Sequence, residues 1–271
     1  MKARTRDFND ITRIVVKIGT STLTKKNGDV DAVWARQLAR QVVALKKAGK
    51  EVILVSSGAI GAGRFVLDLG QRPRSLAEKQ AVAAVGQPRL MRVYKDAFRR
   101  LDTPVAQLLL TYDDLDSRLR YRNAANTLNT LLAMGVVPII NENDTVAVEE
   151  IKFGDNDYLS ALVFELSNAG LLILLTDVDG VLENAGARNG GERVISTVSR
   201  EDWAKVQLGV KDGTGEHGTG GMKSKIQAAR AAVERGGCAV IARGKEKRIL
   251  ERIVAGEAVG TYFAAWGGRA G

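Results

Sequence analysis

Lys17 is the first residue whose type and position suggest chemistry. It stands inside the apolar run 13–18 and is followed at once by Gly19, Thr20 and Ser21. A charged side chain on a buried strand costs free energy unless another group pairs with it. The run therefore predicts either a functional lysine near a strand end or, as the structural alternative, a lysine whose amine reaches water from an edge strand.

A second lysine, Lys225, ends a glycine-rich segment, residues 218–225, that leads into a predicted helix. Glycines, hydroxyls and lysines at a helix start suit a phosphate group, because exposed amides, the helix dipole and ammonium charge all attract it. The segment lacks the G-x-x-x-x-G-K-[ST] order of a Walker A loop. A surface loop with incidental lysines is the alternative.

Polar residues follow two further predicted strands. Ser57 and Gly58 come after the run 51–56, and a turn there could bring backbone amides close to an anion. Thr176 and Asp177 follow the wholly apolar run 171–175, where they could contact a nucleoside or merely turn the chain.

Two segments rich in acidic and amide side chains, 141–144 and 154–157, are the last candidates. They offer donors for a carboxylate and anions that could orient lysines. Turn formation and helix capping use the same residue types, and we expect at least one of Asp155, Asn156 and Asp157 to cap the helix that follows.

The scarcity of two residue types excludes several kinds of chemistry. The chain has one cysteine, Cys238, and one histidine, His217, so it cannot form an internal disulfide and lacks the ligands of a usual zinc site. Ser/His/Asp and Cys/His catalysis each need a placed imidazole, which makes them poor candidates here.

The net charge of +9 permits nucleic acid, anionic substrates or a plain basic surface as its explanation. Lysines and arginines are dispersed over polar positions of helical patterns and are not interleaved with aromatic residues, so we predict no nucleic-acid partner. The apolar runs are strand-sized and residues 1–12 lack the apolar core of a secretory signal. We therefore predict a cytoplasmic protein without a membrane segment.

Apolar runs alternate with helical periodicity along the 271 residues. Runs that are apolar on both faces and alternate with helices are typical of a mostly parallel sheet between helix layers, an α/β fold. In such a sheet, ligands collect at the carboxyl ends of the strands. The predicted strands are 13–18, 51–56, 105–110, 136–140, 171–175 and 238–242. The predicted helices are 31–48, 76–101, one ending near 134, 159–166 and 222–235.

The chain resembles the amino-acid kinase family in a series of segments that occur in one order along nearly its whole length. These are VVKIGTS, VSSGAIGAGR, AVGQ, INENDTV, KFGDNDYLSAL, LLTDVDGVL, GTGGMKSKIQAA and VGTYF. SSGAIGAG, NENDTV and GDND together resemble the branch that phosphorylates glutamate. The resemblance implies a three-layer αβα sandwich in a single domain, 1–271, without the C-terminal PUA domain of many relatives.

The resemblance also implies roles for individual residues. Lys17 and Lys225 are expected to contact the transferred phosphoryl group, with Asp157 organising both. The residues implied for glutamate are Ser57, Gly58, Asp144 and Asn156. The residues implied for ATP are Lys17, Thr176, Asp177, Thr219, Gly220, Gly221, Met222, Lys223, Ser224 and Lys225.

The implied reaction is ATP-dependent phosphorylation of the side-chain carboxylate of L-glutamate to L-glutamyl 5-phosphate, the first step of proline biosynthesis, with Mg²⁺. Such a carboxylate, with a reference pKa of ~4.3, is already ionised at neutral pH and needs no general base. The resemblance further implies feedback inhibition by proline and a homodimer or homotetramer. Two alternatives stay open. One is a kinase for acetylglutamate, aspartate, carbamate or UMP, and the other is an RNA-binding or regulatory protein that keeps the fold.

Overall fold

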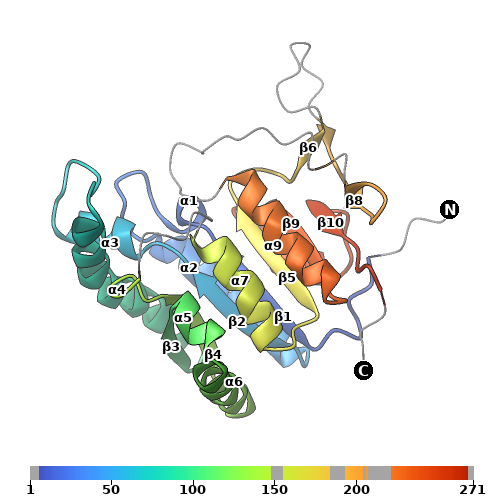
Figure 1. The fold of residues 1–271 in the computed structure, drawn as a ribbon, viewed down its shortest axis with the longest axis horizontal. Helices are drawn as coiled ribbons and strands as arrows, with labels where there is room; N and C mark the ends of the chain where they lie inside the picture. The colour runs from blue at the N-terminus through green and yellow to red at the C-terminus, as the bar shows by residue number, and fades with distance from the viewer. Residues whose placement is uncertain (1–5, 148–154, 184–192, 204–205, 207–220, 268–271) are drawn as a thin grey trace.

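The computed structural model describes residues 6–147, 155–183, 193–203, 206 and 221–267. An eight-stranded sheet runs through this part of the chain in the order β3-β4-β2-β1-β5-β9-β10-β8, with helices on both faces (Figure 1). Its strands are β1 (Arg13–Ile18), β2 (Glu51–Ser56), β3 (Val105–Leu110), β4 (Val137–Glu142), β5 (Leu171–Thr176), β8 (Thr197–Val198), β9 (Cys238–Arg243) and β10 (Thr261–Phe263). The strands from β3 to β9 in this order pair in parallel, and β10 runs antiparallel to β9. The predicted α/β fold with a mostly parallel sheet is confirmed.

The helices alternate with these strands along the chain. They are α1 (Thr20–Leu23), α2 (Ala32–Lys47), α3 (Ala59–Val66), α4 (Leu76–Arg99), α5 (Tyr112–Asp116), α6 (Arg118–Ala133), α7 (Asp155–Leu166), α9 (Met222–Glu234) and α10 (Ile249–Val254). A separate antiparallel pair joins β6 (Leu182–Glu183) to β7 (Arg193–Val194). The longer helices and the central strands match the periodicity of the sequence, whereas α1, α5, β8 and β10 are too short to produce a pattern of their own.

The central strands are buried on both faces, and successive side chains alternate between two cores. Ile14, Val16 and Ile18 of β1 belong to the core beneath α2, α4 and α10. Val15 belongs to the opposite core, which includes residues of α7 and α9. Lys17 shares the parity of Val15, so its side chain leaves the strand toward α7 and α9. Because odd-numbered positions of β1 face α7 and α9, the side chain of Lys17 can contact residues of those two helices.

Most element boundaries differ from the sequence-based expectation by one or two residues, and two of the differences bear on the polar segments. Strand β4 continues to Glu142 because Asn141 and Glu142 pair with Leu109 and Leu110 of β3, so Asn141 is a strand residue. Helix α7 is described from Asp155, so it includes at least the four residues that precede the predicted start. Asn156 and Asp157 are thus residues of the helix, and the residue that caps it lies outside the described ranges. Polar residues at this end of the helix do not produce the apolar periodicity on which the predicted start rests.

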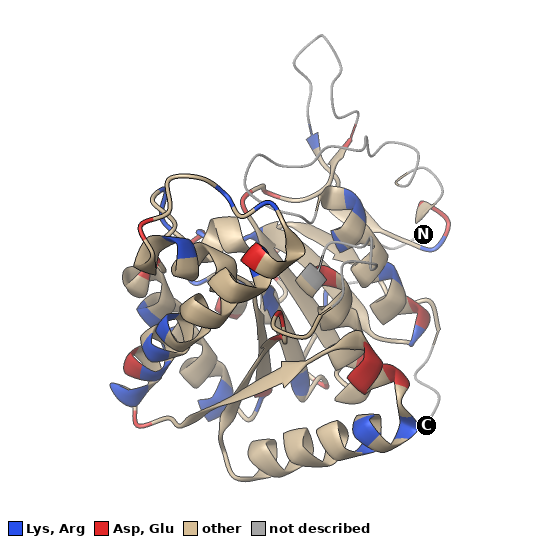
Figure 2. Cartoon of the chain, turned by 60° about the vertical axis from the view of Figure 1, so that its left-hand side comes forward, with Lys and Arg blue, Asp and Glu red and all other residues tan. Residues whose placement is uncertain are grey.

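Lysines and arginines are distributed over many helices and loops, with acidic residues among them (Figure 2). In the described ranges, no helix combines the length and the apolar character that crossing a membrane would require. His217 lies outside the described residues.

Candidate active site

Three polar residues expected to do chemistry lie where central strands end. Lys17 is the fifth residue of β1, Ser57 follows β2, and Thr176 is the last residue of β5. The register aligns these ends, since Ile18 pairs with Ser56 on one side and with Leu175 on the other. The carboxyl edge of the sheet is therefore the candidate site, as expected for a parallel sheet.

Lys17, Asp157, Ser224 and Lys225 form a charged cluster at this edge. Lys17 Nζ lies 2.6 Å from Asp157 Oδ1, and Lys225 Nζ lies 3.2 Å from Asp157 Oδ2. Ser224 Oγ donates to the same Oδ2 at 2.6 Å. The side chains of Lys17, Asp157 and Lys225 are 5%, 0% and 8% exposed, so the cluster is almost closed to water. Two lysines that are 208 positions apart in the sequence thus converge on one carboxylate.

The two helices that cover this face supply the rest of the cluster. Asp157 lies in the first turn of α7, and Ser224 and Lys225 lie in the first turn of α9. Helices α7 and α9 pack side by side across the sheet (Figure 1). The amino end of a helix presents unpaired N–H groups and a partial positive charge. Two such ends, together with a cluster of two ammonium groups and one carboxylate, favour an anionic ligand.

The electrostatics of the cluster keep its carboxylate ionised. Burial opposes ionisation of Asp157, but the charges of Lys17 and Lys225 outweigh burial and hold the pKa of this carboxyl below its usual value. Burial lowers the pKa of the Lys225 ammonium, and the neighbouring Asp157 opposes that shift. A carboxylate with a lowered pKa is a poor proton acceptor, so Asp157 is suited to hold the two amines rather than to act as a base.

Ser57, Gln87, Asn141 and Asn156 form a second group, here called the amide network. Asn156 Nδ2 donates to Ser57 Oγ at 2.9 Å and to Asn141 Oδ1 at 3.0 Å. Asn141 Nδ2 donates to Gln87 Oε1 at 2.9 Å. Ser57, Asn141 and Asn156 are buried, so hydrogen bonding fixes them in one arrangement. The network joins β2, β4, α4 and α7 next to the charged cluster.

Gly58 makes the turn between β2 and α3. Its φ of 111° lies in the left-handed region, where glycine is strongly favoured. A Cβ at this position would also lie 3.3 Å from Leu23 Cδ2. The predicted glycine is therefore required by the turn itself, and the turn places Ser57 within reach of Asn156.

The remaining predicted residues have more varied positions. Asp144 is partly buried in the turn after β4. Thr176 is buried and donates to Asp177 Oδ1 at 3.1 Å. Asp177 is exposed, and its charge acts on Lys225. Gly221 precedes the first residue of α9. Of the other loop residues, Met222 and Lys223 begin α9, and Thr219 and Gly220 lie outside the described residues.

Sequence reasoning missed two members of the amide network. The sequence presents Asn141 only as part of the polar segment 141–144, and Gln87 only as the last residue of the segment AVGQ. The available signal was weak: Gln87 stands between Gly86 and Pro88, which interrupt an otherwise ordinary helical pattern. No periodicity indicates which face of a helix a glutamine will turn toward a sheet.

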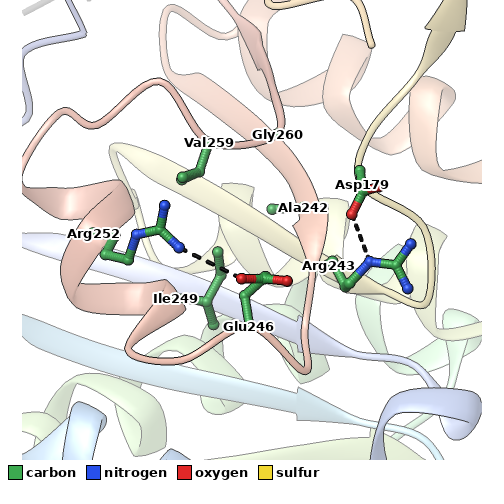
Figure 3. A pocket seen from close by; sticks show the side chains of 8 residues that line it. All are labelled: Asp179, Ala242, Arg243, Glu246, Ile249, Arg252, Val259 and Gly260. Atoms are coloured by element: carbon green, nitrogen blue, oxygen red, sulfur yellow. Dashed lines mark hydrogen bonds and ion pairs between the residues drawn. The ribbon is translucent and has the colours of Figure 1, made fainter. Parts of the chain in front are cut away.

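A small cleft of about 150 Å³ lies beside the carboxyl ends of β5 and β9 (Figure 3). Arg243 Nε lies 2.5 Å from Asp179 Oδ1, and Arg252 pairs with Glu246 and Glu257. The two guanidinium groups that line the cleft are thus already compensated by carboxylates.

The chain matches the amino acid kinase family model over residues 12–243. The glutamate 5-kinase of Citrifermentans bemidjiense is 49% identical over 257 residues, which cover 93% of this chain and 68% of that protein. The glutamate 5-kinase of a Cyanothece species is 52% identical over 252 residues, or 92% of this chain and 68% of that protein.

A solved structure, the UMP kinase of Bacillus anthracis, is similar with a TM-score of 0.64 over 94% of this chain and 96% of that chain. Its sequence identity of 17% limits this likeness to the fold. The family match and the identities confirm the resemblance that the ordered segments indicated, and this chain belongs to the amino acid kinase family.

Proposed function

We propose that this chain transfers the γ-phosphoryl group of ATP to the side-chain carboxylate of L-glutamate. The products are L-glutamyl 5-phosphate and ADP, and the reaction is the first step of proline biosynthesis. Relatives at 49% and 52% identity that are named glutamate 5-kinase support the substrate. The observation that carries the chemistry is the placement of Lys17 and Lys225 on the two oxygens of Asp157.

The acceptor needs no deprotonation, because a carboxylate with a reference pKa of ~4.3 is ionised at neutral pH. The barrier is electrostatic, since an anion must approach a polyanion while negative charge spreads over the transferred group. Fixed positive charges in a nearly dry site offset that repulsion most effectively. Lys17 and Lys225 supply these charges, and Asp157 holds both amines in place while leaving the cluster positive.

The ATP phosphates are assigned to the amino end of α9. Gly221 and Met222 bring backbone N–H groups there, and Ser224 and Lys225 add a hydroxyl and an amine. Thr176 and Asp177, at the end of β5, are assigned to the nucleotide on the neighbouring strand. Thr219, Gly220 and Lys223 complete the proposed ATP loop.

Mg²⁺ fits this site as an ion carried mainly by phosphate oxygens and water, which are its usual ligands in phosphotransferases. When bound, it offsets negative charge on the phosphates. In the described part of the chain, no three acidic, histidine or cysteine side chains lie together as a metal site. The carboxylate of Asp157 is already paired with Lys17 and Lys225. We assign no protein ligand to the ion.

Glutamate is assigned to the β2 and β4 side of the site. Ser57 and Asn156 offer a hydroxyl and an amide next to the charged cluster, with the backbone of Gly58 beside them. Asp144 is the proposed partner of the substrate ammonium group. Holding both reactants in line can contribute as much as ~7 to 11 kcal/mol through effective molarity, so Ser57, Asp144 and Asn156 can matter as much as the lysines.

Feedback inhibition by proline, assembly into a homodimer or homotetramer, and a cytoplasmic location remain predictions of the family resemblance. The curated relatives are longer than this chain, which spans about two-thirds of their length.

A substrate panel tests the proposal. The chain is incubated with ATP, Mg²⁺ and hydroxylamine, which traps acyl phosphates as hydroxamates, and ADP release is measured in parallel. We expect hydroxamate with L-glutamate and little product with aspartate, N-acetylglutamate, carbamate or UMP. Turnover of one of these instead of glutamate would identify another kinase of the family. RNA binding that weakens with salt, with no ATP turnover on any acceptor, would favour the RNA-binding alternative.

A further inference from the structure

The amide network contains one buried donor that the proposed roles do not use. Gln87 Nε2 is shielded from solvent and has no hydrogen-bond partner among the described residues. Buried polar groups in folded proteins are nearly always paired, and leaving one unpaired costs free energy. A donor of this kind at the edge of a ligand site calls for an explanation in terms of a ligand.

The orientation of the Gln87 amide follows from its neighbours. The backbone N–H of Glu142 donates to Asn141 Oδ1 at 2.9 Å, which identifies this atom as the oxygen. Asn141 Nδ2 therefore faces Gln87, and Gln87 must accept with Oε1. Gln87 Nε2 is consequently turned away from Asn141 and remains available as a donor. A backbone group thus determines the direction of two side-chain amides in succession.

The packing of α4 keeps Gln87 in this place. A Cβ on the preceding residue, Gly86, would lie 1.9 Å from the carbonyl oxygen of Ala59 and 2.3 Å from the backbone nitrogen of Gly63. Only glycine allows α4 to approach α3 so closely. Helix α3 starts directly after the Ser57–Gly58 turn, so the position of Gln87 is tied to the turn that presents Ser57.

The strand order places Gln87 at the end of the site away from the lysines. Lys17 belongs to β1, Ser57 follows β2, and Asn141 belongs to β4, and these strands are neighbours in that order. With about 4.8 Å between adjacent strands, the line from β1 to β4 spans roughly 10 Å. The side-chain carboxylate of glutamate must lie at the lysines to receive the phosphoryl group. The α-carboxylate and ammonium group then extend toward β4.

We propose that Gln87 is a substrate-binding residue, whose Nε2 donates a hydrogen bond to the α-carboxylate of glutamate while Asp144 takes the ammonium group. Asn141 is the positioning residue that orients Gln87. The inference rests on the proposed function, because it takes glutamate as the acceptor. The inference adds a residue that binds the α-carboxylate, at the end of glutamate opposite to the reacting carboxylate.

Two substitutions separate a direct contact from a structural role. Gln87→Glu keeps an oxygen that can accept from Asn141 but loses the donor, and Gln87→Met loses both while adding no charge. We expect each to raise the glutamate KM about tenfold to a hundredfold, the effect of losing one hydrogen bond to a charged group. The KM for ATP should stay within about twofold of the wild type, a change of less than ~0.5 kcal/mol. Lowering the pH should reduce the defect of Gln87→Glu, because a protonated carboxyl group regains a donor.

Gln41→Met is the matched control. Gln41 is a glutamine of α2 whose Oε1 accepts from the Leu250 N–H at 3.0 Å and whose Nε2 donates to the Gln37 carbonyl at 3.3 Å. Because both ends of its amide are satisfied within the chain, this variant should lower the thermal midpoint and leave the glutamate KM unchanged. KM does not depend on the fraction of active enzyme, so it remains informative for a partly unfolded variant.

Each pattern of results has one meaning. A raised glutamate KM in both Gln87 variants, with an unchanged ATP KM, supports the contact. If the glutamate KM rises only in Gln87→Met, Gln87 acts by accepting the hydrogen bond from Asn141 and does not contact glutamate. If it rises only in Gln87→Glu, the added negative charge is the cause. Either result, or no change in both, overturns the inference while wild-type turnover of glutamate keeps the proposed function intact. A wild-type chain that does not phosphorylate glutamate refutes both.

Discussion

The charged cluster and the amide network lie next to each other at one sheet edge but use different chemistry. In the charged cluster, two lysines share one carboxylate and all three side chains are almost fully buried. In the amide network, neutral groups hold one another by hydrogen bonds that a backbone N–H orients. Charge is concentrated where the proposed reaction develops charge, and neutral donors lie where a substrate would be recognised.

Substitutions in the two regions should therefore have different effects on activity and stability. Loss of a charge from the cluster should affect turnover and stability, because it leaves another buried charge without compensation. Loss of a donor or of the ammonium partner on the other side should raise mainly the glutamate KM and leave the KM for ATP and the stability nearly unchanged, because those groups contact glutamate.

Asp157→Asn should have the largest effect. It leaves Lys17 and Lys225 buried without their carboxylate, and breaking a buried ion pair in this way costs about 3–5 kcal/mol of stability. Urea denaturation at pH 7 measures the loss. The surface pair Arg230–Glu234, at 2.7 Å, provides the control Glu234→Gln, with an expected loss below about 1 kcal/mol.

The pH dependence of this difference has a defined sign. Because the folded-state pKa of Asp157 is held below its ordinary value of 3.8, its contribution to stability is present above that value. It disappears as pH falls through the folded-state pKa. A variant as stable as the wild type at pH 7 would contradict the strong coupling of the cluster.

Lys225→Ala should reduce kcat about a hundredfold to a thousandfold, or about 2.7–4 kcal/mol, the range for removing one preorganised group that stabilises a transition state. Steady-state ADP release at saturating substrates measures it. Lys47→Ala is the control, since Lys47 is exposed at the end of α2, which leads to the opposite edge of the sheet. Turnover near the wild-type rate in Lys225→Ala would remove Lys225 from the reaction.

Asp144→Ala should raise the glutamate KM about tenfold to a hundredfold, because a hydrogen bond between charged groups contributes about 1.5–3 kcal/mol. The KM for ATP should change little. The exposed Asp96 of α4 provides the control Asp96→Ala, for which both KM values should stay at the wild-type level. Equal increases in both KM values for Asp144→Ala would show that this residue does not distinguish the two halves of the site.

Alkaline pH should have the smallest effect. Burial lowers the pKa of Lys225 from 10.5, so its ammonium loses a proton at a lower pH than an ordinary lysine does. The kcat/KM for ATP should therefore decline as pH rises through that lowered pKa. Arginine stays protonated throughout this range, so Lys225→Arg should show a flatter alkaline limb at a lower rate. An identical alkaline decline in both proteins would assign the limb to another group.

Much of the fold could be predicted because the central strands are buried on both faces. Leu171–Thr176, for example, is apolar at nearly every position, and such a run between helical patterns has few other interpretations. Short elements such as β10, at three residues, carry too little pattern to be recognised. Apolar periodicity places the start of α7 too late because the residues before Leu159 include the polar site residues Asn156 and Asp157.

The sequence by itself determined the alternation of strands and helices, the family, and the polar segments at the strand ends. Each of these depends only on the order of residues within short segments. It also determined that Lys17 shares a side of its strand with Val15, since parity along a strand is a local property, but the helices that cover this side were decided by the fold. The family resemblance named Asp157 as the partner of both lysines, and only the tertiary structure decided that Lys17 and Lys225 each contact a different oxygen of that carboxylate. Only the packing of α4 on α3 decided that Gln87 faces the site. Both depend on distances between segments that lie far apart in the chain, which no local pattern records.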